Sequence, residues 1–295
     1  MAPHLALLVN PAARGGRTLR LLEPVARRLR AGGAELSVIV GGDAADALDR
    51  ACLAVAERPD ALVAFGGDGL VHLAVQAVAG TDVPLGIIPA GTGNDIAAAL
   101  GLAHKDPIAA AGTVLRMRPR AVDAARIGTG DGEELFAGVV CCGFDSRVNE
   151  RANRLTWPPG MARYLLATAQ ELRSFEPIPF RVTLDDGEPY EREAMLVAVG
   201  NTSSYGAGMR VCPDALPDDG LLDVMMVEAL GKAEFLRVFP SVYRGTHVTH
   251  RAVTVRRARS VRLEAPGVVA YADGERIGPG PVTCEIRPGT LTVLT

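Results

Sequence analysis

The first hundred residues alternate short aliphatic runs with amphipathic segments, and this alternation constrains the fold more than any other feature of the chain. Four aliphatic runs predict β-strands, at 4–9, 35–40, 61–65 and 85–88. Four amphipathic segments predict α-helices, at 18–31, 44–58, 70–79 and 95–100. Strands that are apolar throughout and separated by about 10–15 helical residues are typical of a parallel sheet with helices on both faces. The sequence therefore predicts an α/β domain with α/β/α layers.

The pattern of the sequence changes after about residue 120. Short alternating runs follow, separated by turn signals rich in Asp and Gly, at 128–132, 185–187, 218–220 and 273–274. Such pairs between alternating runs favour β-hairpins. We therefore expect two domains, an α/β domain over 1–120 and an antiparallel β-sandwich over 121–295. Helical segments interrupt the second domain at 144–174, broken by Trp157-Pro158-Pro159-Gly160, and at 232–239, and the last run, 290–294, is compatible with a return to either domain.

Composition excludes several classes of protein. The formal net charge of the 295 residues is −3, with 31 Lys+Arg against 34 Asp+Glu and only 4% aromatic residues, which argues against nucleic acid as the main partner. Only two of the cations are lysines, Lys105 and Lys232, and there is no G-x-x-x-x-G-K-[ST] phosphate loop. Enzymes that depend on a lysine amine are therefore disfavoured.

Cysteine usage and hydropathy bear on the compartment. The five cysteines are odd in number and lack C-x-x-C spacing, so we expect reduced, mostly buried thiols in a cytoplasmic protein and no zinc site. The N-terminus has no charged region before its short apolar run, and no apolar window approaches 18 residues. We expect no signal peptide and no transmembrane helix, so that any lipid contact is peripheral.

Three glycine-rich segments follow predicted strands of the first domain. They are 10–16 (N-P-A-A-R-G-G), 66–69 (G-G-D-G) and 89–95 (P-A-G-T-G-N-D). Glycine permits close approach of the backbone, and each loop leads into a helix N-terminus, which favours anions. With so few lysines, the expected phosphate ligands are backbone amides together with Arg14 or Arg17. The alternative is that these glycines only turn the chain.

Asp68 lies between two glycines of the second loop. A carboxylate among phosphate-binding amides would repel a nucleotide unless a divalent cation bridges them, so Asp68 suggests Mg²⁺. The alternative is that Asp68 caps the helix that follows. The third loop leaves the same two interpretations open, because Asn94 is well placed as an N-cap and Asp95 as an acid of the first helical turn.

The segment Asp273-Gly274-Glu275 lies between two apolar runs. An Asp-Gly pair in that position is a strong hairpin signal, and by itself it needs no function. A tight turn is also a rigid place from which carboxylates can be presented to a cleft. Both interpretations are compatible with the same segment.

Five motifs in this order span nearly the whole chain, and together they carry a resemblance to a known family. They are N-P-x-x-x-G-G from Asn10, F-G-G-D-G from Phe65, I-P-x-G-T-x-N-D from Ile88, D-G-L-L-D at 219–223 and D-G-E at 273–275. The set resembles the diacylglycerol kinase catalytic family, which includes bacterial lipid kinases and their sphingosine kinase relatives. The resemblance implies a two-domain kinase with ATP between an α/β domain and a β-sandwich that receives the lipid.

The resemblance also implies roles for particular residues. The ATP contacts would be Asn10, Pro11, Ala12, Ala13, Arg14, Gly66, Gly67, Asp68, Gly69, Gly91, Thr92 and Asn94. Asp68 would act with Mg²⁺ and the phosphates, and Glu275 would be the general base with Asp273 beside it. A structural Mg²⁺ would be held by the carbonyl oxygens of Leu216 and Leu221 and the carboxylate of Asp219.

The second motif departs from the family pattern G-G-D-G-T-x-N-E, because Leu70-Val71-His72-Leu73 follows the last glycine. A threonine there could bond phosphate, whereas leucine cannot. We consider His72 either a replacement phosphate donor or, preferably, a surface residue of the helix. The departure motivates one alternative function, a nucleotide-binding module with reduced or lost catalysis. The G-G-D-G turn, which NAD kinases share, motivates another, a kinase of a soluble acceptor such as NAD.

One segment of the second domain is a candidate for contact with a membrane. The segment 161–172, which follows Trp157, has an apolar stripe that suits a peripheral membrane contact during turnover. More often such a stripe packs on its own domain. A homodimer is compatible with the sequence.

Overall fold

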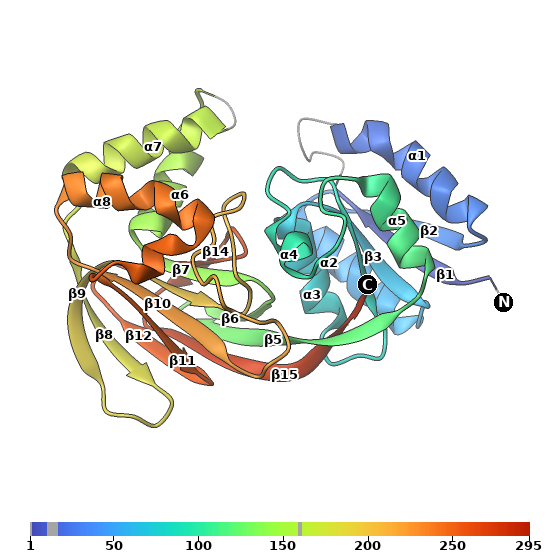
Figure 1. The fold of residues 1–295 in the computed structure, drawn as a ribbon. Helices are drawn as coiled ribbons and strands as arrows, with labels where there is room; N and C mark the ends of the chain where they lie inside the picture. Colours follow the sequence, from blue (N-terminus) through green and yellow to red (C-terminus); the bar gives the residue numbers. More distant parts are fainter. Residues whose placement is uncertain (1, 11–16, 159–160) are drawn as a thin grey trace.

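The computed structural model describes residues 2–10, 17–158 and 161–295, and Figure 1 shows two bodies of different architecture. The N-terminal body contains a parallel sheet in the order β2-β1-β3-β4. Its strands are β1 (His4–Val9), β2 (Glu35–Val40), β3 (Ala61–Gly66) and β4 (Leu85–Pro89). All four were expected at these places from their aliphatic runs.

Helices cover both faces of this sheet, because successive strand residues point to opposite sides. Leu5 and Leu7 pack with α1 (Arg17–Ala31) and α5 (Pro107–Leu115), whereas Ala6 and Leu8 pack with α2 (Ala44–Ala56) and α3 (Asp68–Val78). A short helix, α4 (Asp95–Ala99), follows β4. The α/β/α layers are therefore confirmed. Helix α5 was not expected from the sequence, although Asp106 caps it by accepting from the N–H groups of Ile108 and Ala109.

The C-terminal body is an antiparallel β-sandwich, as predicted. Its strands are β5 (Pro119–Thr129), β6 (Gly132–Phe136), β7 (Val139–Gly143), β8 (Ile178–Leu184), β9 (Tyr190–Gly200), β10 (Leu222–Glu228), β11 (Val253–Ala258), β12 (Ser260–Glu264), β13 (Val269–Ala272), β14 (Glu275–Pro279) and β15 (Val282–Leu294). Three of the expected hairpin turns are found, at 128–132, 185–187 and 273–274. The prediction at 218–220 is wrong, because β10 pairs with β9 across a long connection that ends at this turn.

Helices lie together on one end of the sandwich (Figure 1). They are α6 (Phe144–Arg154), α7 (Met161–Ser174) and α8 (Lys232–Val238), followed by the 3₁₀-helices η2 (Phe239–Arg244) and η3 (Thr246–Thr249). The buried ring of Phe144 meets those of Phe175 and Phe235 edge to face, with centroids 5.2 and 5.1 Å away. No helix in these described ranges is both long and apolar enough to span a membrane.

Two long strands, β5 and β15, pass from one body to the other. Cys284 of β15 pairs with Ile127 within the sandwich, and Val293 pairs with Leu85 of β4 in the parallel sheet. Leu291 and Val293 are buried in the core of the α/β body. The final run therefore returns to the first domain, which was one of the two alternatives, and the paired strands tie the bodies together.

Candidate active site

The glycine turn after β3 and the loop after β4 touch each other. The N–H of Ala90 donates to the carbonyl of Gly66 at 2.7 Å. A Cβ atom on Gly67 would lie 3.0 Å from Cα of Gly91, and one on Gly91 would collide with Cα of Gly67. Glycine is required at both positions because two backbones cross with no room for a side chain.

Asn94 braces the second of these loops from within. Its Oδ1 accepts from the N–H of Gly91 at 2.8 Å, and its Nδ2 donates to the carbonyls of Gly91 and His104 at 3.1 and 3.0 Å. Asn94 occupies the N-cap position of α4 with a left-handed φ of 58°, yet its side chain makes no capping bond. Asn94 therefore occupies the predicted N-cap position, but its side chain bonds the backbone of the loop and not that of the helix.

The first predicted loop lies mostly outside the described residues. Asn10 follows β1 directly. The predicted ATP contacts Pro11, Ala12, Ala13 and Arg14 lie outside the described residues, and so does the side chain of Arg17.

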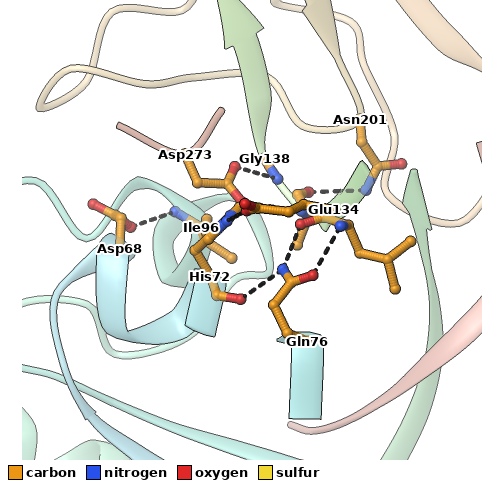
Figure 2. A network of polar contacts seen from close by, with 10 residues as sticks. Asp68, His72, Gln76, Ile96, Glu134, Gly138, Asn201 and Asp273 are labelled. Atoms are coloured by element: carbon orange, nitrogen blue, oxygen red, sulfur yellow. Dashed lines mark hydrogen bonds and ion pairs between the residues drawn. The ribbon is translucent and has the colours of Figure 1, made fainter. Parts of the chain in front are cut away.

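One face of α3 carries three polar side chains, Asp68, His72 and Gln76, at positions i, i+4 and i+8 (Figure 2). Oδ1 of Asp68 accepts from the N–H of Ile96 in α4 at 3.1 Å. Gln76 donates to the carbonyl of Leu135 at 2.6 Å and accepts from its N–H at 2.9 Å. Because Leu135 belongs to β6, this face of α3 is turned toward the β-sandwich.

The structure changes the interpretation of Asp68. The N-cap of α3 is Gly67, without a side-chain capping bond, so the alternative that Asp68 caps its own helix is wrong. Burial raises the pKa of Asp68 to about 6 against the hydrogen bond from Ile96, and the negative charges of Asp95 and Asp273 act in the same direction as burial. A carboxylate in this environment would be relieved by a bound cation.

Asp95 connects the two bodies. Its Oδ2 and Oδ1 accept from the N–H groups of Ala207 and Gly208 in the sandwich, each at 2.7 Å. Asp95 is in the first turn of α4, as predicted, but its buried carboxylate serves this contact between bodies. The loop at 89–95 is thereby fixed against the second domain.

Asp273 and Gly274 form the two-residue turn between β13 and β14, with Ala272 paired to Glu275. Their φ values are 54° and 91°, the positive values that a type I′ hairpin turn needs. The side chain of Asp273 is buried, and it accepts from the N–H groups of Ala137 at 3.1 Å and Gly138 at 2.8 Å. The hairpin prediction is confirmed.

Glu275, exposed at the start of β14, reaches across to the α/β body. A Cβ atom on Gly69 would collide with its Oε1. The structure therefore brings together the D-G-E turn and the G-G-D-G turn, which are about 200 residues apart in the sequence.

His72 is buried, at 5% exposure, and holds a carboxylate on each side of its ring. Nδ1 lies 3.0 Å from Oδ2 of Asp273, and Nε2 lies 2.9 Å from Oε2 of Glu134. Burial lowers the pKa of His72, but the two carboxylates outweigh it and raise the pKa to about 10. At neutral pH the ring is an imidazolium that donates to both. The predicted surface position is wrong, because the ring is buried between the bodies. The alternative of a phosphate donor is not supported either, because both ring nitrogens are already bonded to carboxylates.

A cavity of about 300 Å³ lies between the bodies. Its wall includes polar groups of Asp68, Thr92 and Asp273. The rest of the wall is largely apolar and comes from the helices of the sandwich, including Phe144, Val148, Leu165, Phe239 and Tyr243. A smaller apolar cavity of about 40 Å³ shares Asp145, Tyr205, Met209 and Phe239 with it. Apart from Leu165, which lies in the apolar stripe at 161–172, these apolar residues were not expected from the sequence, because they come from distant segments.

Asp145 is a carboxylate of the cavity wall that was not expected from the sequence. It accepts a hydrogen bond from the hydroxyl of Tyr205. Burial raises the pKa of Asp145 to about 7. A hydrogen-bonding pair therefore lies in an otherwise apolar part of the wall.

The apolar stripe of α7 is divided between two environments. Ala167 and Leu172 are buried against their own domain. Tyr164 and Leu165 are 43% and 65% exposed beside the cavity, and Trp157, just before the helix, is 75% exposed. An exposed apolar rim at a cavity mouth suits contact with an apolar ligand or surface.

The residues implied for a structural metal lie in the turn before β10. Oδ1 of Asp219 accepts from the N–H of Leu221 at 3.1 Å, while Oδ2 pairs with Arg257. The neighbouring Oδ2 of Asp223 is buried, accepts no hydrogen bond from the described residues and lies 3.6 Å from Nε of Arg257. Carboxylate and carbonyl oxygens are the donors that Mg²⁺ prefers, so the donor set fits, and a cation here would share Asp219 with Arg257.

Comparison with known proteins gives a consistent result over the whole chain. The diacylglycerol kinase catalytic domain matches residues 4–127, and the YegS C-terminal NAD kinase beta sandwich-like domain matches residues 138–295. A diacylglycerol kinase of Mycobacterium tuberculosis (strain H37Rv) is 43% identical over 97% of this chain and 93% of its own length. A diacylglycerol kinase of Bacillus subtilis (strain 168) is 30% identical over 87% of this chain and 84% of its own. A solved structure of a putative diacylglycerol kinase from Bacillus anthracis (strain Sterne) superposes with a TM-score of 0.77 at 26% identity, over 99% of this chain and 97% of that one.

Proposed function

This chain belongs to the diacylglycerol kinase catalytic family, and on that premise we propose that it transfers the γ-phosphate of ATP to a hydroxyl of diacylglycerol or a related lipid, with Mg²⁺ as cofactor. The observation that carries the proposal is the cavity between the bodies, in which Asp68 and Thr92 share one wall with Phe144, Leu165 and Phe239. A phosphate-handling edge and an apolar pocket in one cavity suit a substrate that is polar only at its reacting end.

The ATP phosphates are proposed to meet backbone amides. The turn at 66–69 and the loop at Gly91 and Thr92 follow adjacent parallel strands, at whose carboxyl ends ligands bind in such sheets. Neither Lys105 nor Lys232 lines the cavity. Charge on the phosphates would therefore be balanced by a metal and by arginine, including Arg14 of the first loop.

Asp68 is proposed to hold the reaction's Mg²⁺. When bound, the cation would neutralise charge on the β- and γ-phosphates. The carboxylate is half-buried, lines the cavity and has its pKa raised to about 6 by that burial, which are conditions that favour binding of a cation. Its remaining oxygen, Oδ2, is directed to Gly93 in the same loop as Thr92.

Glu275 is proposed as the general base. Gly274 lines the cavity, and the Glu275 carboxylate reaches Gly69 at the phosphate edge. As the lipid hydroxyl attacks phosphorus, its proton would pass to Glu275 while the bond from phosphorus to the ADP oxygen breaks. Proton transfer and positioning are then the protein's main contributions.

The test is a transfer assay with labelled ATP and a panel of acceptors: diacylglycerol, monoacylglycerol, a sphingoid base and NAD. We expect label in at least one lipid and none in NAD. Transfer to NAD alone would favour the soluble acceptor, and ATP binding without transfer to any acceptor would favour a module that has lost catalysis. Binding is followed by the shift in melting temperature on adding Mg²⁺ and ATP.

We propose a second Mg²⁺, a structural one, between the carbonyls of Leu216 and Leu221 and the carboxylate of Asp219. Because an ion that binds only the folded state stabilises it, adding Mg²⁺ without ATP is expected to raise the melting temperature of the wild type by a few degrees. Asp219→Asn is expected to abolish that shift. Asp218→Asn, the neighbouring exposed carboxylate, is the matched control, and an unchanged shift in Asp219→Asn would contradict the site.

The membrane contact is proposed to use Tyr164 and Leu165, which line the cavity and are exposed, together with Trp157, which is exposed just before α7. Leu165→Asp is expected to lower sedimentation with diacylglycerol-containing vesicles severalfold, because it places a charge in the apolar interface. Leu53→Asp is the matched control, since Leu53 is 69% exposed on α2. An equal loss in both variants would overturn the assignment of this surface.

A further inference from the structure

The contact between His72 and the D-G-E turn has a consequence for the proposed reaction. Asp273 accepts three hydrogen bonds, from the N–H groups of Ala137 and Gly138 in the sandwich and from His72 in the α/β body. The N–H of Asp273 also donates to the carbonyl of Val139 at 3.1 Å. With its carboxylate buried and occupied on both sides, Asp273 is a fixed point of the turn.

The backbone of the turn holds Glu275 in a fixed position relative to Asp273. The two-residue turn has positive φ at both central positions, and Ala272 and Glu275 close it as a strand pair. A movement of Asp273 therefore carries Glu275 with it.

Helix α3 contacts both carboxylate-bearing residues of the D-G-E segment, Asp273 and Glu275. Gly69, in its first turn, lies against the carboxylate of Glu275, and His72, three residues later, bonds the carboxylate of Asp273. Figure 2 shows His72 of α3 directed at Asp273, with Glu134 on the far side of the ring and Asp68 at the start of the same helix. The separation between the proposed base and the proposed metal ligand is thus set by one helix.

We propose that His72 is a positioning residue for phosphoryl transfer: its ion pair with Asp273 holds the D-G-E turn so that the Glu275 carboxylate stays at the Asp68–Gly69 turn. This inference rests on the proposed function. Asp273 thereby acts through Glu275, as a second positioning residue, and Glu134 keeps the imidazolium in place from its other side. A misplacement of a reacting group by about 1 Å costs on the order of 100-fold in rate, so a loosened turn should show in kcat.

The rival explanation is that His72 only stabilises the interface between the bodies. Gln76 provides the matched control, because it lies one turn further along the same face of α3 and makes two hydrogen bonds to Leu135 of the sandwich. Its side chain bonds the backbone of Leu135 and of His72, away from the carboxylates of Asp273 and Glu275. Gln76→Ala therefore removes interface bonds without releasing the turn.

The experiment is a double-mutant cycle on the full chain, with kcat and KM for ATP and for the lipid acceptor identified by the transfer assay. His72→Ala is expected to lower kcat by about 10- to 100-fold, with KM for ATP changed less than about threefold. In the Glu275→Gln background the same change should cost less than about threefold, because the base it positions is already lost. Gln76→Ala should leave kcat within about threefold of the wild type.

Two results would overturn the positioning role: equal losses from His72→Ala in both backgrounds, or a loss in Gln76→Ala that matches the loss in His72→Ala. If His72→Ala does not fold, Glu134→Gln replaces it, since that change keeps the bond to Asp273 and removes one charge from the ring's surroundings; a smaller kcat loss, again confined to the background with Glu275, is then expected. If the wild type transfers phosphate to no acceptor, the proposed function is overturned and the inference with it. If the wild type is active but the cycle gives one of the two results above, only the positioning role is overturned.

Discussion

Glu275→Gln is expected to lower kcat for transfer to the lipid acceptor by about 10²- to 10⁴-fold, the usual contribution of a general base. Glutamine has the shape of glutamate but cannot take up the proton that the lipid hydroxyl must lose. The exposed carboxylate of Glu275 reaches Gly69, beside the carboxylate of Asp68, so the change acts where the proposed transfer occurs. Binding of ATP should survive, because the amides of the glycine loops are untouched.

The measurement is a rate at saturating ATP and acceptor, combined with the shift in melting temperature on adding ATP and Mg²⁺. Glu133→Gln is the matched control, because Glu133 is an exposed glutamate of the neighbouring β6 that pairs with Arg126. We expect that control to stay within about twofold of the wild type. A full rate in Glu275→Gln would show that another group accepts the proton.

The fold was predictable from the sequence in those segments whose residue pattern reflects their environment in the folded protein. The runs of β1, β3 and β4 are apolar almost throughout, because helices cover both faces of their sheet and a buried parallel strand shows no alternation of polar and apolar residues. The hairpin at Asp273 and Gly274 was equally predictable, since the two positive φ values demand the residues found there.

The contacts between the bodies were not predictable in the same way. Asp95 bonds Ala207 and Gly208, and His72 bonds Asp273, across more than a hundred residues of chain, so no local pattern specifies the partner. A weaker signal was present for one side of the contact. In the helix D-G-L-V-H-L-A-V-Q-A-V the polar residues Asp68, His72 and Gln76 recur every fourth position, which marks a face that needs polar partners. The spacing alone does not distinguish a polar face in contact with solvent from one that packs against another domain. It would have excluded a surface position for His72 only together with the knowledge that the rest of the helix is buried.

Asp68→Asn is expected to lower kcat by about 10²- to 10³-fold in a way that excess Mg²⁺ does not restore. The reason is that a metal at the phosphates supplies several kcal/mol of transition-state stabilisation, and each 1.4 kcal/mol is about tenfold in rate. Asparagine keeps an oxygen to accept from the N–H of Ile96 but loses the charge that would hold the cation. Asp82→Asn is the matched control, because Asp82 is exposed between α3 and β4.

The same substitution is expected to stabilise the metal-free chain at neutral pH, and this separates a functional loss from misfolding. Burial raises the pKa of Asp68 to about 6 in the folded state, from an ordinary value of 3.8, so the ionised carboxylate favours the unfolded chain. The folded state binds the proton of Asp68 more tightly than the unfolded chain does. The stability that this gives is fully present below about pH 4 and is lost as the pH rises through about 6. The asparagine side chain does not titrate, and in chelator at pH 8 the Asp68→Asn variant should exceed the wild type by up to about 3 kcal/mol, a difference that vanishes toward pH 4. A less stable variant at pH 8, or one whose activity returns with Mg²⁺, would contradict the role given to Asp68.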